Sequence, residues 1–285
     1  MTALPRVSAL PRPRTRRIRP GTVLASALLV LLVVAAFAPG LLAGYDPEAV
    51  DPANALAPMS GDHLFGTDQL GRDVFSRVVY GAGPSLSIGV GATVFAVVAG
   101  GLLGVLAATG GRVVDECVMR VTDVLIAFPG LLLALLMVAV LGPSSFNATL
   151  AIGCSVLPGY VRLARGQALV VRRSDFVRAA VTLGRPGWDI ALRHLLPNAL
   201  PPLMVLSLVN VGTAIVAGSS LSFLGMGPKP PAPEWGVMLS EGRDFLDSAW
   251  FAAFFPGAAL AVSVMALNVV GRRLQHRFEG RLTDV

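Results

Sequence analysis

The residues that could carry out chemistry are few, and their spacing matches no catalytic motif. A phosphate-binding loop of the G-x-x-x-x-G-K-[ST] type requires a lysine, and the only lysine, Lys229, stands between two prolines. The two cysteines, Cys117 and Cys154, are too few for a disulfide framework. The histidines are far apart in the sequence, at His63, His194 and His276. We therefore expect no ATP hydrolysis through such a loop, no metal site and no cofactor.

The composition indicates that these residues are positioned in a membrane. Hydrophobic residues make up 54% of the chain and charged residues 14%, whereas a soluble domain carries roughly 25% charged residues. The net charge of +6 comes from basic residues that lie beside apolar segments and form no basic domain of their own. This placement is typical of orientation in a lipid bilayer, and nucleic-acid binding is not expected.

Six apolar stretches predict an all-α, polytopic bundle of about six transmembrane helices. About 20 residues of helix cross the hydrocarbon, and the stretches lie near 22–43, 85–109, 121–141, 148–164, 197–220 and 250–270. The first follows a basic tail, residues 1–21, and is too long for the apolar part of a signal peptide, so a retained span is favoured. Prolines at 129, 158, 201 and 202 require neighbouring helices to satisfy the freed carbonyls, which predicts a packed bundle.

The distribution of basic residues predicts the orientation. With six spans, 19 of the 23 Lys and Arg residues fall on the side of the two termini. That side should be the cytoplasm, with 272–285 as a cytoplasmic tail. A five-span alternative without 148–164 would place the arginines of 162–195 outside, which the same rule disfavours.

A segment expected to be external, residues 44–84, has the sequence signals of a short helix between His63 and Gly83. Thr67 is a possible cap, and Asp68–Arg72 and Asp73–Arg77 have the i, i+4 spacing of helical ion pairs. We expect an amphipathic helix on the outer membrane face. The alternative is an ordinary surface helix without a partner.

The predicted cytoplasmic loop, residues 162–196, should form two short helices. Ser174 or Asp175 begins the first, Gly184 closes it in the left-handed conformation, and Pro186 suits the first turn of the second. Apolar stripes are expected on both helices: Phe176, Ala180 and Leu183 on the first, and Trp188, Ala191, Leu192 and Leu195 on the second. These stripes would form either an apolar knob for a partner's groove or a contact with the chain's own spans.

This loop resembles the cytoplasmic loop of binding-protein-dependent ABC importer permeases, whose pattern is an Ala-Ala pair, a Gly and a downstream Pro. The corresponding residues here are Ala179, Ala180, Gly184 and Pro197. Over about residues 20–282 the chain resembles the second, C-type permease of the dipeptide/oligopeptide/nickel branch. Three stretches carry this resemblance: Gly66–Arg77, the loop, and Phe223–Gly227 with Pro233–Gly236. Arg178 departs from the wider family, which often has an acidic residue there, and Gly83-Pro84 replaces a basic residue frequent in this branch.

The resemblance implies a type I (MetI-like) permease fold in a bacterial plasma membrane, with a core over 85–271. It also implies four partners in addition to the lipid bilayer: a second, B-type permease, two ATPase subunits and an external solute-binding protein. The implied ATPase-coupling residues are Asp175, Phe176, Ala179, Ala180, Leu183, Gly184, Trp188, His194, Pro197 and Asn198. The implied external motif consists of Gly66, Thr67, Asp68, Gly71, Arg72, Asp73, Ser76 and Arg77.

The implied function is import of dipeptides or oligopeptides, with nickel or glutathione import as alternatives within the branch. An ion-coupled carrier would usually place charged residues inside its spans, and the predicted span interiors hold neutral polar groups such as Asn210 and Asn268. A membrane scaffold without a translocation path is the third hypothesis.

Overall fold

The computed structural model describes residues 20–282, and side chains are described as far as Gln275. Most of the predicted basic tail, 1–21, lies outside the described residues. Within them the chain is helical, and its one isolated β-bridge joins Thr67 to Asp73. The helices are α1 (Pro20–Phe37), α2 (Val74–Thr109), α3 (Gly111–Ala127), α4 (Gly130–Leu141), α5 (Ser145–Arg172), α6 (Asp175–Thr182), α7 (Gly187–Ile190), α8 (Leu196–Phe223), α9 (Trp235–Gly242), α10 (Leu246–Ala249) and α11 (Phe251–Leu282).

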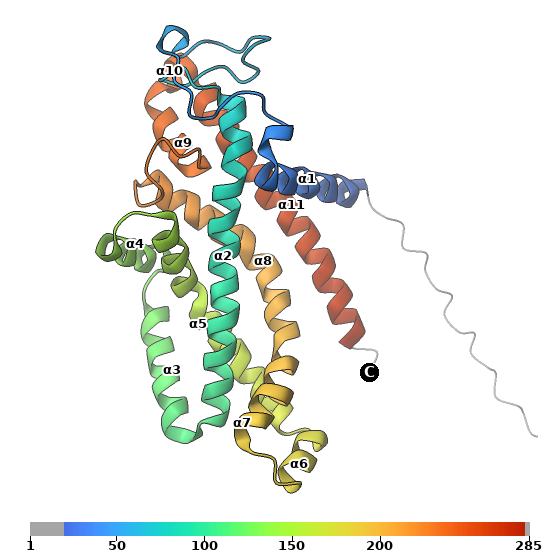
Figure 1. Ribbon diagram of the computed structural model, residues 1–285. Helices are drawn as coiled ribbons and strands as arrows, with labels where there is room; N and C mark the ends of the chain where they lie inside the picture. The colour runs from blue at the N-terminus through green and yellow to red at the C-terminus, as the bar shows by residue number, and fades with distance from the viewer. Residues whose placement is uncertain (1–19, 283–285) are drawn as a thin grey trace, which may run out of the picture.

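Helix α2 is the centre of the bundle and packs most extensively against α5 and α8 (Figure 1). Small residues allow this close approach. A Cβ added to Gly100 would lie 2.5 Å from the Cβ of Tyr160, and one added to Gly104 would lie 2.5 Å from the Cβ of Ala164. The small-residue spacing therefore brings α2 and α5 together, as expected for helix contacts in membranes.

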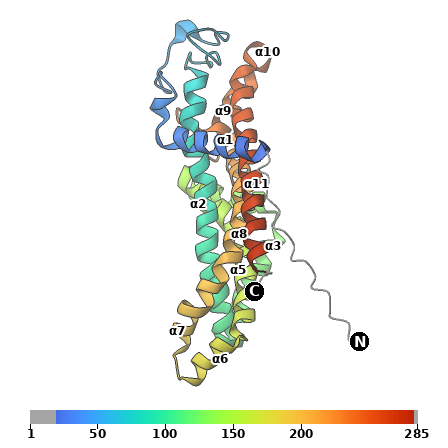
Figure 2. The same cartoon turned by 90° about the vertical axis from the view of Figure 1, so that its right-hand side faces the viewer.

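Three helices of the described chain are long and apolar enough to cross a membrane: α2, the continuous helix Gly187–Phe223, and α11. The predicted span 121–141 is wrong as a single helix, because α3 and α4 meet at a 97° bend at the predicted Pro129 break. Pro158, Pro201 and Pro202 remain inside helices. Helix α1 ends at Phe37, short of the predicted 22–43, and lies across the long helices in both views (Figure 1, Figure 2).

The predicted external helix between His63 and Gly83 is also wrong. Residues before Asp73 form a loop, and Asp73 rather than Thr67 is the cap, since its side chain accepts a hydrogen bond from the Ser76 N–H at 2.8 Å. The helix that begins at Val74 continues without a break into the predicted second span. The boundary predicted between 84 and 85 therefore falls inside α2, and α11 likewise runs past residue 271 to Leu282.

The two predicted motifs lie at opposite ends of the molecule. Figure 1 shows α6 and α7 at one end, and the loop before α2 together with α9 and α10 at the other. The long helices α2 and α8 connect these ends. A movement of one end can therefore be carried to the other by rigid helices.

Candidate functional site

The loop predicted to be cytoplasmic, 162–196, begins within α5 and continues into α6, which starts at the predicted residue. Ser174 is its N-cap residue, with an extended backbone, and Asp175 is the first helical residue. Gly184 has φ +75°, and its N–H donates to the Val181 carbonyl at 2.9 Å. The left-handed conformation is accessible to glycine at no steric cost, so this residue turns the chain toward α7.

The second short helix is not separate, which differs from the prediction. Pro186 precedes α7 as its N-cap residue, and α7 continues through a π-helical segment, η3 (Ala191–Leu195), directly into α8. Single π-helical turns are rare and occur frequently at functional sites. His194 lies in this turn, its carbonyl accepts a hydrogen bond from the Asn198 amide at 2.6 Å, and Pro197 follows in the first turn of α8. The loop is thus joined rigidly to a long helix.

Burial divides the loop's apolar residues into two faces. Val177, Ala180, Ile190 and Leu195 are buried in a cluster with Val105, Ala108 and Ala168. The exposed apolar residues of α6, α7 and η3 are Phe176, Ala179, Val181, Leu183, Trp188 and Leu192. The predicted stripes are therefore mixed, since Ala180 and Leu195 contact the chain's own helices, whereas Leu183 is 80% and Trp188 65% exposed. We define these six exposed residues as the apolar knob.

Two ion pairs to Asp189 of α7 connect the residues that lie between the knob positions. Arg185 donates to Asp189 at 2.9 Å, and Arg193 lies 2.9 Å from the other carboxylate oxygen. The hydrogen bond from Arg185, with a further contribution from the charge of Arg193, lowers the pKa of Asp189. A carboxyl group with a depressed pKa stays ionised at neutral pH, so both pairs persist there.

At the opposite end, the external motif forms a tight loop instead of a helix. The Thr67 hydroxyl donates to the Asn54 carbonyl and accepts from the Ala57 N–H. Gly66 and Gly71 have positive φ values of 70° and 76°. A Cβ on Gly71 would lie 1.8 Å from the Asp51 carbonyl oxygen, so the close approach of these two segments requires glycine.

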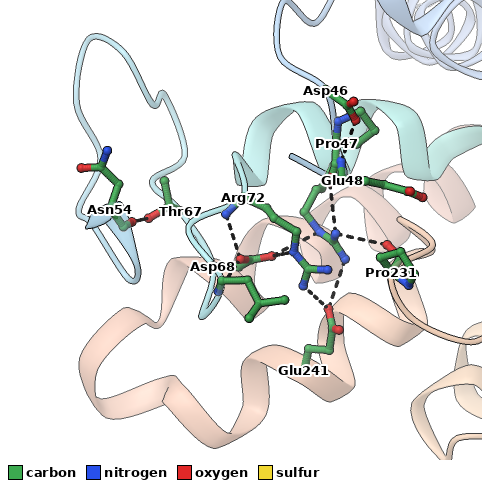
Figure 3. Close-up of polar contacts among 11 residues, drawn as sticks. Asp46, Pro47, Glu48, Asn54, Thr67, Asp68, Arg72, Pro231 and Glu241 are labelled. Atoms are coloured by element: carbon green, nitrogen blue, oxygen red, sulfur yellow. Dashed lines mark hydrogen bonds and ion pairs between the residues drawn. The ribbon is translucent and has the colours of Figure 1, made fainter. Parts of the chain in front are cut away.

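Two arginines of this motif are buried and share carboxylates (Figure 3). Arg72 and Arg77 are each 1% exposed. The Oε2 atom of Glu241 on α9 accepts from both guanidiniums at 3.1 Å. Asp68 accepts from Arg72 Nε at 2.6 Å and lies 3.4 Å from Arg77 Nε. Two positive and two negative charges therefore balance in one cluster, which we call the external charge cluster after the motif predicted to be external.

The predicted pairing was partly correct. Asp68 and Arg72 do pair, although in a loop, whereas Asp73 caps α2 and contacts His63 at 3.0 Å instead of pairing with Arg77. Ser76 is buried in the first turn of α2. Arg77 also donates to the carbonyls of Pro47 and Pro231, at 3.2 and 3.3 Å.

The third stretch that carried the resemblance packs beside this cluster. Glu234 is fully buried, caps α9 by accepting from the Val237 N–H at 3.0 Å, and accepts from the Ser85 hydroxyl at 3.0 Å. The Trp235 indole donates to the Val78 carbonyl at 2.9 Å. These bonds fasten α9 to α2, so two stretches far apart in sequence form one structural unit.

Sequence reasoning missed Glu241 and two ion pairs between α3 and α5. Arg162 donates to Asp123 at 2.6 Å, and Arg165 pairs with Asp115. The sequence analysis described the predicted span interiors as neutral. Arg162 nevertheless lies within the fourth predicted span, 148–164, and Arg165 lies one residue past its end. The i, i+3 spacing of Arg162 and Arg165 places both on one face of α5, and Asp115 and Asp123 of α3 carry the opposite charge. This pattern could have indicated the two ion pairs.

Comparison with known proteins supports one family. Residues 100–284 match the model described as the binding-protein-dependent transport system inner membrane component. The chain is 41% identical to a probable D,D-dipeptide transport system permease of Escherichia coli K12 over 252 residues, 88% of this chain and 85% of that protein. It is 37% identical to a glutathione transport system permease of Pectobacterium atrosepticum over 270 residues, 94% of this chain and 89% of that protein.

Solved structures agree on the fold. An inward-facing methionine ABC transporter chain matches with a TM-score of 0.57 and 16% identity, over 77% of this chain and 99% of that chain. Importers of this family combine such membrane components with a separate ATPase and a solute-binding protein. This chain belongs to the binding-protein-dependent transport system inner membrane components, and is a multi-pass permease subunit of an ABC importer rather than an enzyme.

Proposed function

We propose that this permease imports short peptides, which a solute-binding protein delivers and a second, B-type permease helps to translocate. The names of its relatives support a peptide substrate: D,D-dipeptide, dipeptide and glutathione, itself a peptide. The observation that carries the proposal is the apolar knob. It is exposed at the end of the molecule opposite the external charge cluster, where an ATPase groove would receive it.

The coupling mechanism follows from the connection between the knob and the helices. Helices α6 and α7 rest on Val105, Ala108 and Ala168 of α2 and α5, and α7 continues into α8. When ATP binding closes the two ATPase subunits, the knob of this chain, seated in one ATPase groove, would displace α8 as a lever. The translocation path would then open toward the binding protein. The residues assigned to coupling therefore divide into knob residues that would contact the ATPase and buried residues, such as Ala180, that support them.

Uptake by the reconstituted complex tests this function. In proteoliposomes with the second permease, the ATPases and the binding protein, we expect ATP-dependent accumulation of free-ended dipeptides. Omission of the binding protein should abolish it. Accumulation of a nickel chelate and of no di-, tri- or oligopeptide would contradict the peptide assignment. Accumulation without ATP would favour an ion-coupled carrier.

We also propose that both termini and the knob lie in the cytoplasm, because basic residues are distributed 18 to 4 in favour of that side even when Arg162, inside the predicted span 148–164, is left out. Asp62, in the loop before α2, and Arg173, just before α6, are exposed toward opposite ends of the molecule (Figure 1). In a background without Cys117 and Cys154, a membrane-impermeant thiol reagent added outside should label Asp62→Cys and leave Arg173→Cys unlabelled. The reverse pattern would show that the orientation is inverted.

A further inference from the structure

An ion pair between α3 and α5 has no role in the knob or in the external charge cluster. Arg162 Nη2 donates to Asp123 Oδ1 at 2.6 Å, and the two side chains are 50% and 53% exposed. Among the described residues this bond is the only hydrogen bond recorded for either side chain. The second carboxylate oxygen and the other guanidinium donors are therefore free to bind a further group.

The depth of this pair follows from the packing of α2 on α5. Gly100 of α2 faces Tyr160, and Gly104 faces Ala164, so the two helices run in parallel and Arg162 lies near the level of Leu102. The exposed side chains of α2 at and around this level are all apolar: Val90, Val94, Val98, Leu102 and Leu106. At 1.5 Å per residue this stripe is about 24 Å long, most of the roughly 30 Å hydrocarbon core. The pair therefore lies within the length of this apolar stripe, one helical turn from its end at Leu106.

Lipid is a poor environment for this pair. Charged side chains inside a membrane are costly, and they almost always face the bundle interior or a water-filled cavity. The centre of a protein–protein interface is likewise depleted of charged residues. A half-exposed pair at this depth, with unused hydrogen-bonding atoms, best fits a wall of a hydrated path.

We infer that Asp123 and Arg162 line the translocation path and contact the charged ends of the solute in transit. The inference rests on the proposed function, because a free-ended peptide carries an ammonium group for Asp123 and a carboxylate for Arg162. Each charge of the pair would exchange its partner for the solute's opposite charge as the solute passes. Such an exchange keeps every charge paired at a depth where an unpaired charge is expensive.

Cysteine accessibility tests the location without reference to the substrate. In the assembled complex lacking Cys117 and Cys154, Asp123→Cys and Arg162→Cys should react with a charged methanethiosulfonate reagent at least tenfold faster than Leu102→Cys. Leu102 is the matched control, because it is 49% exposed at the same depth on the apolar stripe. Reaction of all three at equal rates would overturn the inference.

Uptake tests the contact with the solute. Arg162→Gln and Asp123→Asn should lower the maximal uptake rate of a free-ended dipeptide at least tenfold, while the complex assembles at the wild-type level. Glu116→Gln, on the solvent-exposed first turns of α3, should not change it. Wild-type uptake by both variants, or loss of uptake together with assembly, would overturn the contact. If the wild-type complex takes up no peptide, the proposed function fails, and cysteine accessibility still decides whether the pair lines a path.

Discussion

Replacing Ala179 with arginine should leave the permease in the membrane and separate it from its ATPase. Ala179 is exposed on the apolar knob, beside Phe176 and Leu183. A bulky group in a packed contact costs about 1–3 kcal/mol, and a desolvated charge adds to this. Since 1.4 kcal/mol corresponds to a factor of ten, we expect at least a tenfold loss of uptake and loss of ATPase co-purification. Both are measured on membranes that contain wild-type amounts of the chain.

The neighbouring alanine distinguishes docking from folding. Ala180 is 6% exposed and packs with Val177 and Leu195 on the chain's own helices. Ala180→Arg should therefore lower the amount of chain in the membrane, because an unpaired charge would be buried. Ala179→Ser is the matched control and should retain uptake. If Ala179→Arg assembles with the ATPases and couples ATP hydrolysis to uptake normally, the knob is not the docking surface.

The sequence predicted the local geometry of the knob well, because that geometry depends on neighbouring residues. Ser174 and Asp175 begin α6, and Gly184 ends its turn with a positive φ. Which apolar residues would be buried was harder to predict. Phe176 and Ala180 are four residues apart and share a helical stripe, yet α2 and α5 cover only Ala180, and periodicity does not show where the neighbouring helices lie.

Two errors have the same physical origin, a choice among equivalent local signals. Thr67 and Asp73 are both good caps, and the tertiary contacts of Thr67 with Asn54 and Ala57 leave Asp73 to begin α2. Pro129 and Pro158 both interrupt apolar runs, yet only at Pro129 does the chain turn sharply. The close contact of α5 with α2 keeps Pro158 within a continuous helix. The partner of Arg72 is likewise non-local, since Glu241 lies 169 residues away.

Glu241 is the residue whose removal should most destabilise the external end. Without it, Arg72 and Arg77 would remain buried with Asp68 as the only carboxylate of the described residues within ion-pair distance, because Glu241 Oε2 accepts from both. Breaking a buried ion pair by removing one partner typically costs about 3–5 kcal/mol. Glu241 is itself 18% exposed, so we expect a cost near the lower limit, about 3 kcal/mol. Glu241→Ala should lower the unfolding temperature of the purified chain and make residues 44–72 sensitive to protease added outside.

Two further variants separate charge balance from a general loss of packing. Glu116→Ala removes half of the Arg112–Glu116 pair, whose side chains are 91% and 63% exposed, and should cost less than about 1 kcal/mol. Adding Arg72→Met to Glu241→Ala leaves one arginine facing Asp68, so the cluster is neutral again and part of the stability should return. Equal unfolding temperatures for Glu241→Ala and Glu116→Ala would show that the cluster does not hold the external loop to α9. A double variant less stable than Glu241→Ala alone would show that charge balance is not the reason for its stability.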